Sequence, residues 1–194
     1  MITCDFLVIG GGVIGLSIAR ELKTRHTNAR IVLIEKESAC GAHASGRNSG
    51  VLHAGFYYSP DSLKAKFTKR GNEQMTAYCE EKQIPLNKCG KLVVAKDAGD
   101  LKSLDELFRR GQANGITLQE LTVAEAKSIE PRVKTYQRAL FSPHTSTVNP
   151  LHVVDAMQQD ALREGIQICF GTAYLGRDNR QVLTNQDRIR SEER

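Results

Sequence analysis

The chain has 194 residues, of which 40% are hydrophobic and 25% are charged, and its formal net charge is +5 at pH 7. This composition is typical of a globular protein of one domain or slightly more. The basic residues are spread along the chain without interleaved aromatic residues, which argues against nucleic-acid binding. An excess of positive charge suits an anionic cofactor and an acidic substrate.

The sequence also argues against membrane, disulfide and metal roles. The longest apolar stretch, residues 6–19, is too short to cross a bilayer, and Asp5 precedes it where a signal peptide carries basic residues. Five cysteines without C-x-x-C spacing argue against a disulfide framework or a zinc site, and five unpaired histidines predict no metal. We expect a cytoplasmic protein, with peripheral association at the inner membrane as the alternative.

A glycine turn near the N-terminus is the most informative motif. Residues 6–9 are apolar, as in a buried strand, and Gly10, Gly12 and Gly15 then form G-x-G-x-x-G at the start of a periodic helix. Gly10 permits a tight turn, Gly12 lets the backbone approach a pyrophosphate, and Gly15 lets the helix pack close to the strand. The helix N-terminus then faces a diphosphate with its amides and its positive dipole.

The sequence after this turn strengthens the interpretation. The first helix is expected to end at residues 23–26, and residues 30–35 form a second apolar strand that ends in Glu35. Glu35 lies twenty positions after Gly15, where a carboxylate accepts hydrogen bonds from a ribose hydroxyl. We predict a dinucleotide-binding βαβ unit; the alternative is a glycine-rich buried turn with a solvated Glu35.

A small, polar loop is predicted at residues 38–50. Because it follows the ribose-binding acid directly, we interpret it as a close-fitting segment rather than as a flexible surface connection. Its donors to phosphates and to a ring system would be Ser45, Arg47, Asn48 and Ser49.

Helices and strands are mixed in the rest of the chain. Ser59 and Pro60 are expected to be the N-cap and first residue of a long helix. This helix has Leu63, Phe67, Met75 and Tyr78 available for burial. In chain order we expect a partly buried segment at 51–58, helices at 61–82, 101–114, 122–130 and 149–164, and strands at 90–95, 137–141, 167–170, 173–175 and 181–183.

Two helix ends carry specific signals. Gly115 is the expected C′ residue of the helix at 101–114. Thr122 and Glu125 form a capping box at the start of the next helix, which Pro131 closes. By contrast, residues 185–194 are polar and predict no buried face.

Three blocks of this sequence together resemble the FAD-dependent oxidoreductases of the D-amino-acid oxidase type. They are the glycine turn with its helix, residues 33–36, and residues 44–50. Within that group, residues 47–66 with His-Ala-Gly-Phe-Tyr-Tyr at 53–58 are similar to the L-2-hydroxyglutarate oxidases and dehydrogenases. The likeness is expected to extend from about residue 5 to about residue 170.

The resemblance implies oxidation of an L-2-hydroxy diacid to the 2-oxo diacid. Hydride passes from the substrate Cα to flavin N5, while a base removes the hydroxyl proton. The electron acceptor is left open among oxygen, a quinone and a carrier protein. The implied FAD-binding residues are Gly10, Gly12, Val13, Ile14, Gly15, Glu35, Lys36, Ser45, Arg47, Asn48, Ser49 and Val51.

His53 is the implied catalytic residue, close to the isoalloxazine. An imidazole titrates near neutrality, so it is suited to take the hydroxyl proton or to bind a substrate carboxylate. The alternatives are a histidine that only shapes the flavin pocket and one that attaches the flavin covalently. Tyr57, Tyr58 and Lys64 are candidate contacts to an acidic substrate, or else packing and solvated residues, and His144 is a substrate contact or a loop residue.

These expectations define an α/β fold in which a Rossmann-like FAD-binding βαβ domain is interrupted by part of an α+β substrate domain. The predicted parts are residues 1–80 (FAD-binding), 81–145 (partial substrate domain), 146–176 (return to the FAD-binding domain) and 177–194 (polar tail). Proteins of the resembled family are roughly twice this length, so we expect a truncated or frameshifted form.

Four functions remain open at this point. The first is FAD-dependent oxidation of an L-2-hydroxy acid, with L-2-hydroxyglutarate as the expected substrate. The second is the same fold acting on an amine, an amino acid or a glycerol phosphate. The third is a nicotinamide dehydrogenase, which the polar loop after Glu35 disfavours. The fourth is an inactive fragment or one part of a split enzyme.

Overall fold

The computed structural model describes residues 2–179 and 181–191. The contacts divide the chain into two compact units. Unit 1 runs up to Ser49 and resumes at Pro150, and unit 2 is Gly50–Asn149. One unit therefore interrupts the other, and the chain leaves unit 1 at residue 49, well before the predicted domain boundary at residue 80. The assignment of the two units to cofactor and substrate remains a prediction.

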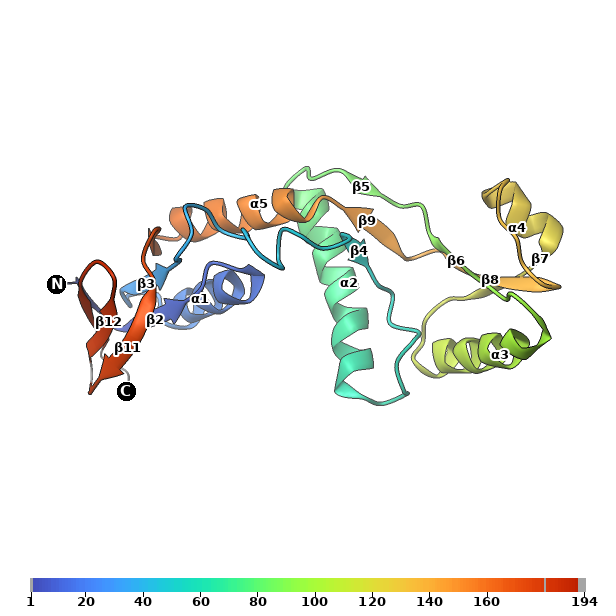
Figure 1. Ribbon diagram of the computed structural model, residues 1–194, viewed down its shortest axis with the longest axis horizontal. Helices are drawn as coiled ribbons and strands as arrows, with labels where there is room; N and C mark the ends of the chain where they lie inside the picture. The colour runs from blue at the N-terminus through green and yellow to red at the C-terminus, as the bar shows by residue number, and fades with distance from the viewer. Residues whose placement is uncertain (1, 180, 192–194) are drawn as a thin grey trace. The chain divides into compact units, whose positions relative to one another are not determined.

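A parallel sheet with a crossover helix forms the centre of unit 1. Strand β2 (Phe6–Ile9) pairs with β3 (Ile31–Ile34), and helix α1 (Val13–Arg25) connects them (Figure 1). Strand β10 (Gln167–Cys169) pairs with the other edge of β3, which gives the order β10-β3-β2. All four residues of β3 are buried, as expected for a parallel strand covered on both faces. The predicted βαβ unit and the return of the chain to its sheet are confirmed.

Helix α5 (Pro150–Arg163) packs against α1 in the same unit. It buries Val153, Val154 and Met157. The Arg20 guanidinium on α1 lies 2.8 Å from Glu164 Oε1 and 3.3 Å from Asp160 Oδ2, so one cation joins the two helices. The helix predicted at 149–164 is confirmed.

A second sheet in unit 1 corrects the interpretation of the C-terminal residues. Its order is β1 (Ile2–Cys4), β13 (Arg188–Ser191), β12 (Gln181–Thr184) and β11 (Tyr174–Asp178). Ile189 is only 2% exposed and packs with Cys4, Val32 and Ile34. The prediction of a polar tail without a buried face is therefore wrong for residues 185–191, while residues 192–194 lie outside the described part. A single buried isoleucine among arginines is too weak a pattern to predict a strand.

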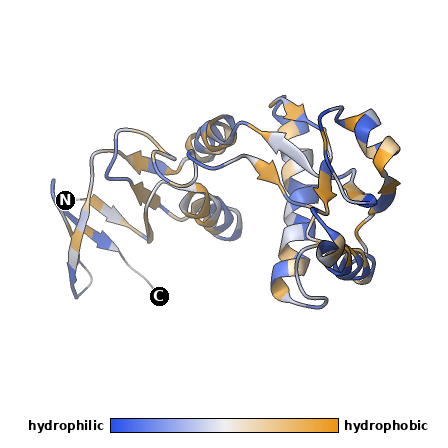
Figure 2. Ribbon diagram, turned by 45° about the vertical axis from the view of Figure 1, so that its right-hand side comes forward, coloured by the Kyte–Doolittle hydropathy of each residue, from blue (hydrophilic) through white to orange (hydrophobic). Residues whose placement is uncertain are grey.

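Two three-stranded sheets and three helices make up unit 2. The first sheet has the order β4 (Val51–Leu52), β9 (Ser146–Val148), β5 (Leu86–Asn87), and the second has β6 (Lys91–Val94), β8 (Arg138–Ser142), β7 (Gln119–Thr122). The helices are α2 (Leu63–Glu81), α3 (Ala98–Ala113) and α4 (Val123–Ile129). Figure 2 shows hydrophobic and hydrophilic residues mixed along the helices, as expected for helices that bury one face.

The predicted helix ends in unit 2 are partly right. Gly115, at φ +64°, follows α3 as predicted, and the amides of Gly115 and Ile116 donate to the last carbonyls of the helix. The capping box of Thr122 and Glu125 is present at α4. At α2, however, the N-cap is Ser62, whose hydroxyl accepts from the Ala65 amide, and not Ser59.

Helix α2 buries less of its apolar surface than predicted. Leu63 and Phe67 are 69% and 65% exposed, while Met75 and Tyr78 are half-buried. The buried face of the helix is marked instead by Ala65 and Cys79. The apolar spacing thus predicted the helix correctly and its buried face incorrectly.

Candidate cofactor site and the His53 loop

The glycine turn between β2 and α1 has the backbone geometry that its sequence predicts. Gly10 adopts φ +102°, a conformation that side chains with a Cβ rarely take. A Cβ built on Gly15 would lie 1.9 Å from the Gly10 carbonyl oxygen, so only glycine allows α1 to start this close to β2. The roles of Gly10 and Gly15 in the turn therefore follow directly from this geometry.

Backbone amides at the start of α1 are available to an anion. The Val13 amide donates to Ser45 Oγ at 3.0 Å. Within the described part of the chain, the amides of Gly12, Ile14 and Gly15 have no acceptor. No acidic residue lies in the first turn of α1, and Gly12 is its N-cap without a side-chain cap. This end of the helix therefore fits a pyrophosphate, which its amides and dipole would stabilise.

Glu35 lies at the carboxyl end of β3, beside the glycine turn. It is 8% exposed, and its Oε2 accepts from the Gly11 amide at 2.6 Å while its Oε1 accepts from the Glu37 amide at 2.9 Å. The carboxylate therefore ties the glycine turn to the segment that follows β3. Each carboxylate oxygen retains acceptor capacity, so ribose binding by Glu35 is compatible with these two bonds.

A groove of about 1180 Å³ runs beside these residues within unit 1. It is lined by β2, the glycine turn, the exposed side of α1, and the loop residues Ala44, Ser45 and Asn48. A groove with an apolar wall and free amides at one end suits an elongated cofactor with an anionic centre.

The remaining predicted cofactor residues differ in exposure and in the unit to which they belong. Asn48 Nδ2 donates to the Ala44 and Ser45 carbonyls, so this amide stabilises its own loop. Lys36 is exposed, with its Nζ 3.5 Å from Glu37 Oε1. Arg47 and Ser49 are exposed, whereas Val51 belongs to β4 in unit 2.

His53 lies in unit 2, just after β4, and is exposed. Although the residue as a whole is exposed, its imidazole is partly desolvated, and this desolvation together with the positive charge of Lys91 lowers its pKa. A lowered pKa keeps the ring neutral at pH 7, which is the form that accepts a proton.

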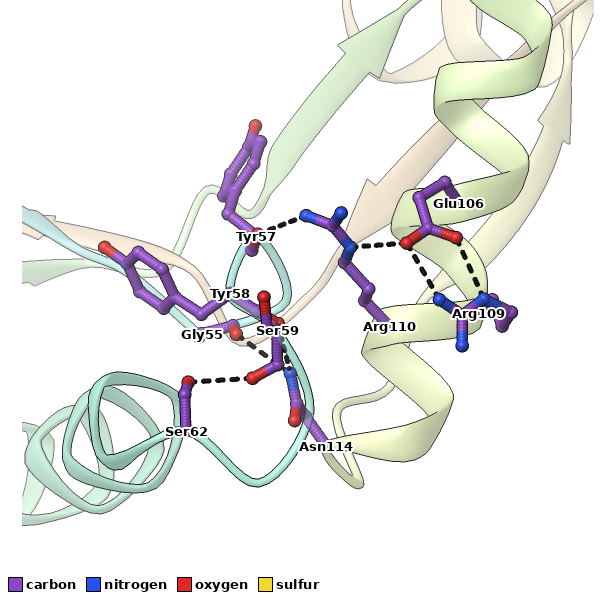
Figure 3. A network of polar contacts seen from close by, with 9 residues as sticks. All are labelled: Gly55, Tyr57, Tyr58, Ser59, Ser62, Glu106, Arg109, Arg110 and Asn114. Carbon is purple, nitrogen blue, oxygen red and sulfur yellow. Dashed lines mark hydrogen bonds and ion pairs between the residues drawn. The ribbon is translucent and has the colours of Figure 1, made fainter.

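Residues that the sequence did not single out hold the loop after His53. Asn114 Nδ2, from the C-cap of α3, donates to the Tyr58 carbonyl at 3.0 Å and to the Gly55 carbonyl at 3.4 Å (Figure 3). Arg110 donates to the Tyr57 carbonyl at 3.1 Å. Glu106 accepts from Arg110 and also from Arg109. The two arginines hold the pKa of Glu106 down to about 2.

Two lysines cover the tyrosines of this loop. Lys91 Nζ lies 4.6 Å from the centre of the Tyr57 ring, and Lys64 Nζ lies 4.6 Å from the Tyr58 ring. Lys64 was a candidate substrate contact, whereas Lys91 was missed because nothing in its local sequence marks it. His144 lines a separate cavity of about 580 Å³ in unit 2, and its backbone carbonyl accepts a hydrogen bond from Asn72 Nδ2.

We expect the Lys91→Gln substitution to raise the pKa of His53 part of the way towards its usual value, because the repulsive charge is lost while the partial burial stays. Titration of the imidazole proton signals by NMR measures this shift. Lys64→Gln is the control, since Lys64 does not contribute to the His53 shift. An unchanged His53 pKa in Lys91→Gln would contradict the assignment.

We expect Asn114→Ala and Arg110→Ala to loosen residues 55–59 at a cost of about 1–2 kcal/mol, since each removes one or two hydrogen bonds to loop carbonyls. Hydrogen exchange of the loop amides should accelerate in both variants. Arg109→Ala is the matched control, because Arg109 contacts Glu106 but no loop carbonyl. Equal exchange in all three variants would argue against a positioning role.

The described residues hold no group of three His, Cys, Asp or Glu side chains suited to a metal ion. Over the same residues, no helix is long and apolar enough to span a bilayer.

The parallel βαβ unit, its glycine turn and the free amides at the start of α1 are typical of a dinucleotide-binding α/β protein. The family model described as FAD dependent oxidoreductase (DAO) matches residues 5–192. The chain therefore belongs to the DAO family of FAD-dependent oxidoreductases, and FAD is the cofactor of that family. The match also corrects the expectation that the likeness ends near residue 170.

Curated relatives indicate where in this family the chain falls. The L-2-hydroxyglutarate dehydrogenase of Escherichia coli strain K12 is 39% identical over 172 residues, which cover 89% of this chain and 40% of that protein. The mitochondrial L-2-hydroxyglutarate dehydrogenase of Nematostella vectensis is 40% identical over 170 residues, or 86% and 37% of the two chains. This chain spans about two fifths of the length of these relatives.

Solved structures share the fold over nearly the whole chain. L-alpha-glycerophosphate oxidase from Mycoplasma pneumoniae with FAD bound matches with a TM-score of 0.87 and 27% identity, over 99% of this chain and 53% of that one. Glycine oxidase from Geobacillus kaustophilus matches with a TM-score of 0.88 and 25% identity, over 99% and 54%. The mixed α/β fold of the DAO family is thereby established.

Proposed function

We propose that this chain binds FAD in unit 1 and takes part in oxidising an L-2-hydroxy acid, with L-2-hydroxyglutarate as substrate and 2-oxoglutarate as product. The observation that carries the proposal is the end of α1, where the Gly12, Ile14 and Gly15 amides lack an acceptor in the described structure beside a long groove. The similarity to two L-2-hydroxyglutarate dehydrogenases supports the choice of substrate.

The residues of unit 1 hold and orient the cofactor in this proposal. Amides of the glycine turn and of the start of α1 bind the pyrophosphate, and Glu35 accepts from an adenosine ribose hydroxyl. The loop residues Ser45, Arg47 and Ser49 supply further donors to the cofactor. Bound FAD supplies the hydride acceptor for oxidation of the substrate carbon.

His53 is the proposed base for the substrate hydroxyl. Its lowered pKa keeps the imidazole neutral at pH 7, so it is ready to accept the proton as the carbon is oxidised. The hydrogen bonds from Asn114 and Arg110 to residues 55–58 hold the loop that follows it. These residues act through the loop and are positioning residues.

The proposed substrate carries two carboxylates, which cationic side chains would bind electrostatically. Lys91 and Lys64 are each held over a tyrosine ring on the segment that follows His53, and Lys91 acts electrostatically on His53 itself. We propose that the ammonium of Lys91 attracts a carboxylate of the diacid. Tyr57 and Tyr58 then serve to orient the two lysines.

A second candidate is oxidation of a glycerol phosphate, because a solved structure similar to this chain is an L-alpha-glycerophosphate oxidase. The same basic residues would suit a phosphate. Glycine oxidase, another similar structure, suggests an amino acid as a third substrate class.

Anaerobic reduction of the FAD-loaded chain tests the substrate. We expect L-2-hydroxyglutarate to bleach the visible flavin absorption band, while the D-isomer, L-alpha-glycerophosphate and glycine leave it unchanged. Bleaching by glycerophosphate or glycine instead would replace the proposed substrate. Reoxidation of the reduced sample with oxygen or with a quinone then identifies the electron acceptor.

A further inference from the structure

His53 is an exposed residue on a segment of unit 2 that is otherwise covered. Residues 54–56, which follow it, are buried, and Leu52 before it is half-buried. Strand β4 ends at Leu52, so the chain leaves the sheet at the point where His53 begins. A strand of two residues holds its own end weakly, because so short a ladder has few backbone bonds. The contacts on either side of His53 therefore decide how well its imidazole is placed.

The side-chain amide of Asn72 binds the backbone directly before His53. Its Nδ2 donates to the Leu52 carbonyl at 2.9 Å and to the His144 carbonyl at 3.2 Å. The last backbone pair between β4 and β9 joins Leu52 to Ser146, and His144 precedes that pair in the chain. One NH2 group, which carries two donors, thus connects the end of β4 to the approach of β9.

Helix α2 also contacts the segment after His53. Gly55 adopts φ +101°, and a Cβ built there would lie 3.4 Å from the Lys69 backbone nitrogen and 3.5 Å from the Ala65 carbonyl oxygen. The backbone of Gly55 therefore packs against the backbone of α2. Lys69 and Asn72 are three positions apart, which places them on the same face of the helix. This face of α2 contacts the chain on both sides of His53.

The stability of α2 alone does not explain an asparagine at this position. Asparagine is a poor helix former that is favoured at caps and turns, whereas Asn72 lies inside the helix, far from the N-cap Ser62 and the C-cap Lys82. Its contribution comes from the two carbonyls that it binds. Gln74 carries a similar amide on the same helix, but it is exposed and forms no side-chain hydrogen bond within the described part of the chain.

We propose that Asn72 is a positioning residue for His53 and acts through the Leu52 carbonyl. The inference rests on the proposed function, in which His53 takes the proton of the substrate hydroxyl. A general base must lie within hydrogen-bond reach of that proton, and a displacement of about 1 Å costs up to about a hundredfold in rate. On the other side of His53, Asn114 holds the Gly55 carbonyl. Two side-chain amides therefore hold the segment that carries the base.

The first test measures His53 without substrate. Asn72→Leu removes both hydrogen bonds but keeps the side-chain volume, and leucine is the better helix former, so α2 should stay folded. We expect NMR titration to show the pKa of His53 rising towards its usual value, because desolvation and the charge of Lys91 depend on where the ring is held. Asn72→Ala removes the same bonds without adding apolar surface and should give the same shift. Gln74→Leu is the matched control and should leave the pKa unchanged.

The second test uses the FAD-loaded chain and L-2-hydroxyglutarate. The rate of anaerobic flavin reduction at saturating substrate should fall at least about tenfold in both Asn72 variants, while the substrate concentration for half the maximal rate changes little. Gln74→Leu should react at the unsubstituted rate. An unchanged His53 pKa in both Asn72 variants, or an unchanged reduction rate, would overturn the proposal. If the unsubstituted chain is not reduced at all, the proposed oxidation fails, and the His53 titration still decides whether Asn72 positions the ring.

Discussion

Replacing Gly15 by alanine should unfold or severely distort unit 1 and abolish FAD binding. The new Cβ would lie 1.9 Å from the Gly10 carbonyl oxygen, which is backbone and has no side-chain freedom to move away. Either α1 shifts from β2 or the turn opens, and both remove the amide geometry at the helix end. Overpacking of this kind costs about 3 kcal/mol. Urea denaturation and FAD titration of the same sample measure the two effects.

Gly71→Ala is the matched control for this experiment. Gly71 lies in helix α2, and a Cβ built there meets nothing within 4 Å. Alanine in a helix interior is favoured over glycine by about 0.5–1 kcal/mol, so this variant should be slightly stabilised. A Gly15→Ala chain with normal stability and normal FAD affinity would show that the close contact at Gly15 is unimportant.

Replacing Glu35 by alanine is expected to have the second largest effect. The substitution removes the acceptor for two backbone amides, those of Gly11 and Glu37, at a buried position. Leaving the buried Gly11 amide without a partner costs about 1–3 kcal/mol, and the half-buried Glu37 amide loses a hydrogen bond worth about 1 kcal/mol, so we expect a loss of about 2–4 kcal/mol in unfolding free energy. FAD affinity should fall as well, because the glycine turn loses its anchor and the ribose loses its proposed acceptor.

Two further variants separate these contributions. Glu35→Gln keeps one acceptor oxygen but turns an NH2 group towards an amide donor, so it should be nearly as destabilised as Glu35→Ala. Glu21→Gln is the control, since among the described residues Glu21 forms only an exposed pair with Arg25 on the surface of α1. If Glu35→Ala unfolds at the same urea concentration as Glu21→Gln, the carboxylate does not anchor the turn.

Local sequence signals predicted the cofactor-binding part of the fold well. The glycine turn, the first helix and the strand ending in Glu35 each depend on short-range features, namely φ freedom, apolar periodicity and strand hydrophobicity. The capping box at Thr122 and the stop at Gly115 are equally local. The structure contains these features as predicted because they depend little on residues far away in the chain.

Features that depend on distant contacts were missed. Strand β13 pairs with its neighbour β12 and, in parallel, with β1, which lies at the opposite end of the sequence. Phe67 has helical spacing, but it is 65% exposed in the part of the chain that the structure describes. The roles of Lys91 and Asn114 arise only when the strand and the helix C-cap meet the loop after His53. None of these has a local signature.

The most direct test of the account is titration of the purified chain with FAD. Binding is measured by the changes in flavin absorbance and fluorescence. The account predicts saturable binding of one FAD per chain, lost in Gly15→Ala and retained in Gly71→Ala. Absence of saturable binding to the unsubstituted, folded chain would contradict the claim that unit 1 of this chain holds the cofactor.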